Sequence, residues 1–164
     1  MTDRIALSYR SHVMPSSPIR KLVPYAEKAK KAEKTVYHLN IGQPDIKTPA
    51  AMMDAVRSFN HTVLEYGTSK GNESLREAMS GYYSSFGLDI KPREISITQG
   101  ASEAALFAYS VLMDPGDEVI LLEPFYANYN GFASMLGIKT VPITLKGSED
   151  FALPPKEVIC KHIT

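Results

Sequence analysis

Apolar residues recur at helical spacing after a serine–proline pair, and this pattern predicts the first helix of the chain. Ser17 is placed to cap that helix, and Pro18 falls at its first position, where a missing N–H is tolerated. Pro24 interrupts the apolar stripe, so we expect a kink or a restart there. The first fifteen residues show no period and are expected to form an extended arm. The apolar stripe consists of Ile19, Leu22, Val23, Ala26 and Ala29.

The next part of the chain predicts one strand and two helices. The strand is expected over residues 36–41. One helix is expected after Thr48-Pro49, and the other after Asn72, because hydroxyl and amide side chains satisfy the free N–H groups at a helix start. Gly87 is expected just past the end of the second helix, in the left-handed conformation.

From residue 94 onward, predicted strands and helices alternate. Alternation with short turns is typical of a parallel sheet covered by helices, so the predicted fold class is α/β. The run from Val119 to Leu122 is apolar at every position, as expected of a strand buried on both faces. The predicted strands are 94–98, 118–122 and 139–143, and the predicted helices are 101–113 and 126–136, the latter stopped by Gly137.

Composition narrows the classes of function. The chain has 164 residues, 44% hydrophobic and 22% charged, which is ordinary for a globular protein of about one domain. Its 18 basic residues balance 18 acidic ones, which argues against nucleic acid or an anionic membrane as a partner. We see no apolar stretch near the ~20 residues of a membrane helix and no secretory signal in the first ten residues. The single cysteine, Cys160, fits a reducing compartment, and a cytoplasmic protein is expected.

The segment around Gly100 is the best candidate for binding an anion. A predicted strand ends there and a helix begins with Ala101 and Ser102. Free N–H groups at a helix start, together with the helix dipole, favour phosphate, and Ser102 adds a hydroxyl donor. An ordinary capped turn would show the same local pattern. Neither the dinucleotide fingerprint nor the P-loop motif is present.

Three other segments offer weaker signals. Tyr126 follows a predicted strand, where an aromatic ring could either stack on a flat ligand or simply pack. Gly42 lies in a turn in which glycine allows close backbone approach to a ligand, although a plain turn is equally consistent. The loop over residues 65–71 holds Tyr66 and Lys70. The four histidines show no metal-ligand spacing with one another or with Cys160, so no metal site is predicted.

Taken in order, these segments resemble the amino-terminal part of class I aminotransferases, the pyridoxal-phosphate enzymes of fold type I. The resemblance is closest to the aspartate-aminotransferase-like branch and covers about residues 14–164. Each motif is weak alone, but the ordered set is specific. The segments that carry it are Ser17–Leu22, Asn40–Pro49, Asn72–Glu77, Asp114–Val119 and Glu123–Tyr126.

The resemblance implies an architecture and a set of roles. It implies an α/β/α sandwich with a mostly parallel sheet, of which this chain holds only part. Residues 1–44 would be the arm and a segment of the small domain, and residues 45–164 the first part of the large cofactor-binding domain. The implied roles are cofactor phosphate binding by Gly100, Ala101 and Ser102, ring stacking by Tyr126, substrate contacts by Gly42 and Ile19, and a phosphate contact across a homodimer by Tyr66.

The implied function is transfer of an amino group between an amino acid, acidic or broad-range, and a 2-oxo acid, with pyridoxal 5'-phosphate as cofactor. In the family, the Schiff-base lysine and the arginine that grips the substrate lie further along the sequence than Thr164, so no catalytic residue is assigned, and the chain alone is expected to be inactive. Lys70 follows a serine but lies in the phosphate-contacting segment, so it is not taken as that lysine. Two alternatives remain: a non-catalytic truncated product, and an unrelated phosphate- or nucleotide-binding α/β domain.

Overall fold

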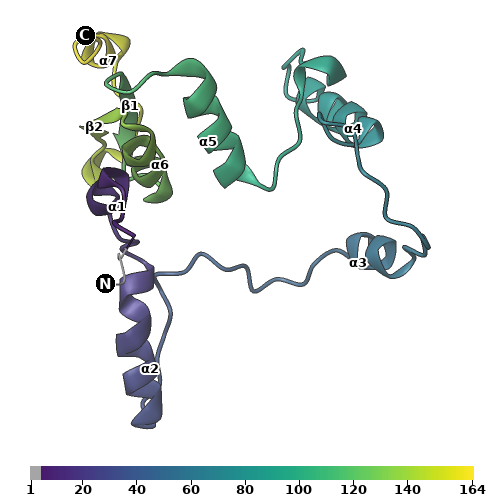
Figure 1. The fold of residues 1–164 in the computed structure, drawn as a ribbon, viewed down its shortest axis with the longest axis horizontal. Coiled ribbons are helices and arrows are strands. Elements are labelled where there is room, and N and C mark those ends of the chain that lie inside the picture. The colour runs from purple at the N-terminus through teal and green to yellow at the C-terminus, as the bar shows by residue number, and fades with distance from the viewer. Residues whose placement is uncertain (1–4) are drawn as a thin grey trace. The chain divides into compact units, whose positions relative to one another are not determined.

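Two strands pair in parallel within residues 99–164. In the computed structural model, which describes residues 5–164, β1 (Glu118–Glu123) lies beside β2 (Lys139–Thr144), with the two strands in register from end to end. Helix α6 (Asn128–Leu136) connects them, as a parallel pair requires, and packs against β2 (Figure 1). The predicted α/β class with a parallel sheet is confirmed.

Short-range sequence features determine the turns that flank the β1–β2 pair. Helix α5 (Ala101–Leu112) ends before a tight turn in which the Asp117 N–H donates to the Asp114 carbonyl at 3.1 Å. Gly137 ends α6 in the left-handed conformation with φ +76°, and the next N–H, that of Ile138, donates to the Ala133 carbonyl at 2.9 Å. The glycine stop was predicted from the sequence and is confirmed.

The amino-terminal segment is more helical than its sequence pattern predicts. Residues Tyr9–Val13 form the short helix α1, which packs against α6, so the expected extended arm is wrong there. Residues 1–4, part of that arm, lie outside the described residues. A 3-10 turn, η1 (Arg20–Leu22), follows Ser17, whose hydroxyl accepts the Arg20 N–H at 3.3 Å. The α-helix α2 (Val23–Lys31) then begins with Pro24 in its first turn, which confirms the expected restart.

Residues 35–98 form a second compact unit, separate from the unit that joins the described residues up to 34 with residues 99–164. The second unit contains α3 (Ala50–Arg57), α4 (Glu73–Ser84) and the 3-10 turn η2 (Pro92–Glu94). Asn72 caps α4, because its side-chain oxygen accepts the Ser74 N–H at 3.0 Å. Gly87 has φ +78°, and its N–H donates to the Ser84 carbonyl at 3.0 Å, so the predicted glycine stop is also confirmed. The domain division expected at residue 44 stays a prediction.

Two predicted strands do not form. Residues 36–41 and 94–98 lack strand pairing in the described structure. Ile95 has extended backbone, with φ −103° and ψ 131°, but its N–H donates back to the Pro92 carbonyl at 3.3 Å and the Ile97 N–H donates to the Lys70 carbonyl at 3.0 Å, which is no strand ladder. A strand needs a partner that continues the hydrogen-bond ladder, and apolar pattern alone does not supply one.

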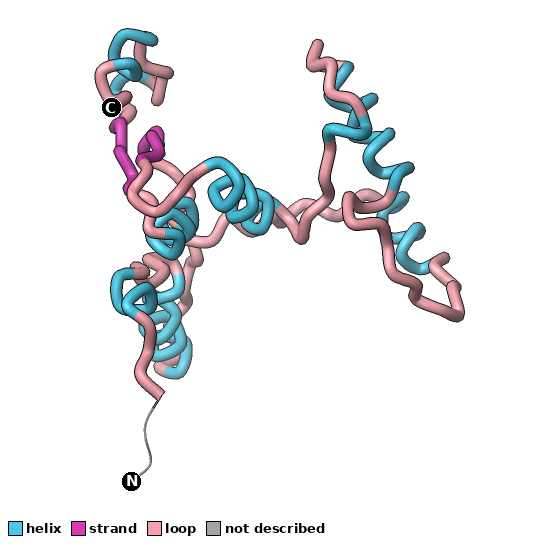
Figure 2. Tube along the Cα trace, turned by 45° about the horizontal axis from the view of Figure 1, so that its top comes forward, coloured by secondary structure: helices cyan, strands magenta, loops and turns pink. Residues whose placement is uncertain are grey.

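The buried core is small. The apolar residues buried in the described structure are Ile95, Ala133, Ile138 and Ile143. Strand β1 is half-buried from Val119 to Glu123, so the expectation that both its faces are covered is not met within residues 5–164. Figure 2 shows β1 and β2 side by side. The chain continues into the 3-10 turn η3 (Gly147–Glu149) and the short helix α7 (Lys156–Cys160). None of the helices formed by residues 5–164 is long and apolar enough to cross a bilayer.

Candidate functional site

The start of α5 presents a set of free backbone donors. Gly100 precedes the helix with φ +79°, and a Cβ built on it would meet nothing within 4 Å. Ala104 is the first residue whose N–H bonds back along the helix, to the Gly100 carbonyl at 3.3 Å. Among the described residues, 5–164, no hydrogen-bond acceptor pairs with the N–H groups of Ala101, Ser102 and Glu103 or with the Ser102 hydroxyl. These donors and the helix dipole together form a site suited to an anion.

Glu103 stabilises this turn and leaves the helical amides accessible. Its carboxylate accepts the Gln99 N–H at 2.6 Å and so closes the chain onto the first turn of the helix. The side chain thereby satisfies an amide that precedes the helix and leaves the three helical amides free. Ala101 and Ser102 are exposed, and their small side chains leave the donors accessible. The sequence pattern had not indicated this role for Glu103.

Tyr126 stands in the loop that leaves the carboxyl end of β1. The chain reverses between α5 and β1, so the start of α5 and the end of β1 lie at the same end of this unit (Figure 1). The Tyr126 side chain is half-exposed, with 49% of its surface accessible. Its hydroxyl oxygen accepts a hydrogen bond from the Asn128 amide at 2.9 Å, and its ring contacts the Tyr129 ring edge-on. An accessible ring in this place can stack on a planar ligand.

The segment that precedes Ile19 lies beside the Tyr126 loop. Residues Met14–Pro18 line a groove together with Glu123–Phe125 and the first turns of α6. Met14 approaches Gly131 of α6, where an added Cβ would be 3.8 Å from the methionine methyl carbon. The structure therefore brings the amino-terminal segment and the loop of Tyr126 together. Ile19 itself is half-buried and is not among the residues that line the groove.

The two remaining predicted residues belong to the unit of residues 35–98. Gly42 is exposed, and a Cβ built on it would meet nothing within 4 Å, so its backbone is open to approach. Tyr66 is fully exposed. The loop after it is tied down, because Lys70 Nζ donates to the Arg93 carbonyl at 3.0 Å and Arg76 Nε to the Gly71 carbonyl at 3.3 Å. Lys70 thus has a structural role in this unit: it holds the loop after Tyr66 to Arg93.

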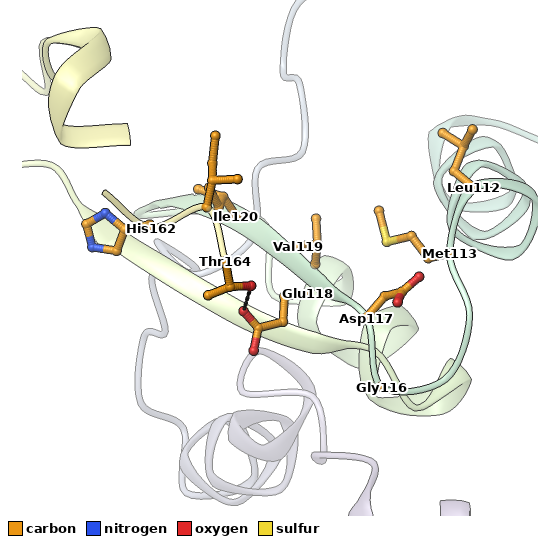
Figure 3. A pocket seen from close by; sticks show the side chains of 10 residues that line it. Leu112, Met113, Gly116, Asp117, Glu118, Val119, Ile120, His162 and Thr164 are labelled. Atoms are coloured by element: carbon orange, nitrogen blue, oxygen red, sulfur yellow. Dashed lines mark hydrogen bonds between the residues drawn. The ribbon is translucent and has the colours of Figure 1, made fainter. Parts of the chain in front are cut away.

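A hollow elsewhere in the first unit contains none of the predicted site residues. It lies between the end of α5, the start of β1 and residues 162–164. Figure 3 shows Thr164 reaching Glu118, where the threonine hydroxyl donates to the carboxylate at 3.1 Å. The lining of this hollow combines apolar side chains with Asp117 and Glu118. The described residues contain no group of three or more potential metal ligands. We do not assign a function to it.

Comparison with known proteins identifies the family. The sequence profile of the family described as "Aminotransferase class I and II" matches residues 34–161. This chain belongs to that family. The match includes the start of α5 and the Tyr126 loop, so the free amides and the exposed ring lie within the region matched by the family.

The relatives are aminotransferases with several different names. The chain is 36% identical over 137 residues to a (5-formylfuran-3-yl)methyl phosphate transaminase of Methanocaldococcus jannaschii, covering 82% of this chain and 37% of that protein. It is 34% identical over 157 residues to an aspartate aminotransferase of Pyrococcus horikoshii, covering 94% and 39%. An alanine aminotransferase structure from Pyrococcus furiosus superposes with a TM-score of 0.88 and 31% identity, covering 97% and 41%. This chain therefore spans about two fifths of the length of these proteins.

Asn128 and Arg76, like Glu103, are residues that sequence reasoning missed. Asn128 holds the Tyr126 hydroxyl, and Arg76 anchors the loop that follows Tyr66 through bonds to the Gly71 and Pro92 carbonyls. Asn128 lies two residues after the aromatic at a helix start, a position from which it can reach back. No sequence signal distinguishes that bond from an ordinary capping contact. The partners of Arg76 lie 5 and 16 residues away and are visible only in the fold.

Proposed function

We propose that this chain is the amino-terminal portion of a pyridoxal-phosphate-dependent aminotransferase that moves an amino group between an amino acid and a 2-oxo acid. The observation that carries the proposal is the start of α5, where three free amides and the Ser102 hydroxyl follow Gly100 within the region matched by the family. A phosphate needs such donors and open space, and Gly100 leaves that space. The residues present therefore fit the phosphate of the cofactor.

Each residue would do a separate part of the binding. The amides of Ala101, Ser102 and Glu103 would hold the phosphate, and Tyr126 would cover one face of the cofactor ring. Gly42 would offer its backbone to the substrate carboxylate, and the segment of Ile19 would close over the substrate. Pyridoxal phosphate itself supplies the electron sink that lets an amino acid lose its α-proton. The chain's own contribution is to fix and orient that group.

The full exposure of Tyr66 supports a homodimer with shared sites. A tyrosine with its whole side chain accessible gains most when another surface covers it. The loop behind it is tied to Arg93 by Lys70, so the ring is presented from a fixed base. We propose that Tyr66 contacts the cofactor phosphate bound by a second copy of the chain.

The amino donor and the activity of the 164 residues alone belong to the proposal as well. We expect an acidic or broad-range donor, and the aspartate and alanine aminotransferases among the relatives are consistent with either. We assign no Schiff-base lysine within this chain, and Lys70 is engaged with Arg93. The 164 residues alone are therefore expected not to transaminate. The lone cysteine favours a cytoplasmic location.

Titration with pyridoxal phosphate tests the proposal. The complete product of the gene that encodes this sequence should acquire the visible absorbance of the protein-bound cofactor. Ser102→Ala should weaken binding about tenfold or more, because a hydrogen bond to a charged group contributes about 1.5–3 kcal/mol. Ser110→Ala is the matched control, since Ser110 lies near the other end of α5 and donates to the Leu106 carbonyl at 2.8 Å.

Three results would count against parts of the proposal. If the complete product binds no pyridoxal phosphate while it binds a nucleotide or inorganic phosphate, the alternative of an unrelated phosphate-binding domain is favoured. If it binds the cofactor and the Ser102→Ala and Ser110→Ala variants bind it equally well, the start of α5 is not the phosphate site. Turnover by the purified 164-residue chain, with its length checked by intact mass, would refute the expected inactivity.

A further inference from the structure

The ring of Tyr126 is held from two directions by residues of the helix that follows it. The Asn128 side-chain amide donates to the tyrosine hydroxyl oxygen at 2.9 Å. The Tyr129 ring meets the Tyr126 ring at a centroid distance of 5.7 Å and an interplanar angle of 87°. In an edge-on contact the rim of one ring meets the face of the other, so this contact leaves at least one face of the Tyr126 ring uncovered. Tyr126 is thus constrained at its hydroxyl and by one ring contact, while about half of its surface stays accessible.

The two residues that contact Tyr126 belong to a well-packed helix. Asn128 and Tyr129 are half-buried residues in the first turn of α6, and the same helix contains the buried Gly131 and Ala133. Helix α6 packs against α1, α5 and β2, so its first turn cannot shift freely. An accessible tyrosine without such support would sample several side-chain rotamers. The hydrogen bond from Asn128 favours one of them before any ligand binds.

We propose that Asn128 is a positioning residue that holds the Tyr126 ring in the orientation needed to stack on the cofactor; this inference rests on the proposed function. The hydroxyl oxygen of Tyr126 accepts from Asn128, so the hydroxyl hydrogen is free to point to another acceptor. The ring is therefore oriented in advance, which reduces the ordering that ligand binding would otherwise require.

Asn130 provides a matched comparison in the same helix. Its side-chain oxygen accepts from the Thr140 hydroxyl at 3.0 Å, which ties α6 to β2 without involving Tyr126. Asn128→Ala and Asn130→Ala thus remove the same atoms from the same helix and break bonds to different partners. Tyr126→Phe removes the other end of the Asn128 bond and keeps the ring.

A double-mutant cycle on the complete gene product tests the inference. Asn128→Ala and Tyr126→Phe should each weaken pyridoxal phosphate binding about two- to tenfold, the range expected for one net hydrogen bond. Each should also reduce the visible circular dichroism per bound cofactor, because the ring would no longer be fixed. The double variant should match the single variants, since both remove one interaction. Asn130→Ala should lower thermal stability and leave the dichroism per bound cofactor unchanged.

A second readout needs no cofactor. In the apo protein, the NMR resonances of the labelled Tyr126 ring, assigned through Tyr126→Phe, should shift in Asn128→Ala and stay in place in Asn130→Ala. Unchanged Tyr126 resonances in Asn128→Ala would overturn the inference. Additive losses of cofactor affinity in the double variant would overturn it too, while the proposed function stands. If Asn128→Ala fails to fold, Tyr126→Phe with undiminished affinity and dichroism gives the same refutation. Failure of the parent protein to bind the cofactor at all would instead mark the failure of the proposed function, and the inference would fall with it.

Discussion

The loop after Tyr66 packs against Ile97 at Gly71, and this contact leaves no room for a side chain at position 71. Gly71 has φ +89°, and an added Cβ would lie 2.5 Å from the Ile97 Cβ and 2.6 Å from its Cγ1. Ordinary contact between carbon atoms is about 3.5–4.0 Å. The two segments cannot easily separate, because the Ile97 N–H donates to the carbonyl of Lys70, the residue before Gly71, at 3.0 Å. We predict that Gly71→Ala opens this junction.

The free-energy cost of Gly71→Ala follows from two separate effects. The left-handed conformation costs a residue with a Cβ about 1–2 kcal/mol. Forcing a methyl group against Ile97 costs about 1–3 kcal/mol more, as other overpacked sites do. The sum, about 2–5 kcal/mol, corresponds to a local opening equilibrium roughly 30- to 4,000-fold larger, since about 1.4 kcal/mol is a factor of ten.

Native-state amide hydrogen exchange measures this opening directly. The Ile97 amide should exchange at least about 30-fold faster in Gly71→Ala, up to the limit set by global unfolding. Gly67→Ala is the matched control, because Gly67 lies in the same loop, its φ is not left-handed, and an added Cβ there would meet nothing within 4 Å. Unchanged exchange at Ile97 in Gly71→Ala, or equal acceleration in both variants, would refute the reasoning. If Tyr66 acts as proposed, Gly71→Ala should also weaken cofactor binding.

Three further predictions concern stability. Asn72→Ala should cost about 1 kcal/mol, measured by thermal unfolding, because the cap on the Ser74 N–H is lost; an unchanged midpoint would contradict this. Gly137→Ala should cost about 1–3 kcal/mol in urea unfolding, since φ is +76° and an added Cβ would lie 3.3 Å from the Pro115 Cβ; equal stability would show that the turn relaxes. Burial raises the pKa of Tyr109, so the unfolded chain ionises first and stability should fall as pH rises above about 10, the unperturbed tyrosine value. Tyr109→Phe should reduce that alkaline loss, and identical pH profiles for the two proteins would rule the effect out.

Features that depend on a few neighbouring residues were predictable. The restart at Pro24, the cap at Asn72 and the glycine stops at Gly87 and Gly137 all appear where the sequence places them. Each rests on backbone groups within about five residues, so the local sequence contains nearly all of the interaction. The helix at α1 was missed because its short segment has no apolar period and gains its packing from α6, more than a hundred positions later.

Some features of the candidate site also follow from the local sequence, and others depend on the tertiary structure. The free amides at the start of α5 follow from any helix that begins after a glycine turn, and Gly100 marked that place in the sequence. The support of the Tyr126 ring by Asn128 and the anchoring of the Tyr66 loop by Arg76 depend on side-chain directions and on distant partners. Residue types alone do not determine those directions.

The sequence by itself determined the α/β class, the glycine-led turn at the start of α5 and the ordered motifs of the aminotransferase family. These are properties of residue order and short-range bonding. Only the tertiary structure decided which predicted segments became strands: β1 and β2 pair, whereas residues 94–98 do not, although the sequence predicts a strand in all three places. A strand exists through the hydrogen bonds of its neighbour, and those neighbours come from elsewhere in the chain. The tertiary structure likewise decided that Gly71 must be glycine, because Ile97 reaches it from across the fold.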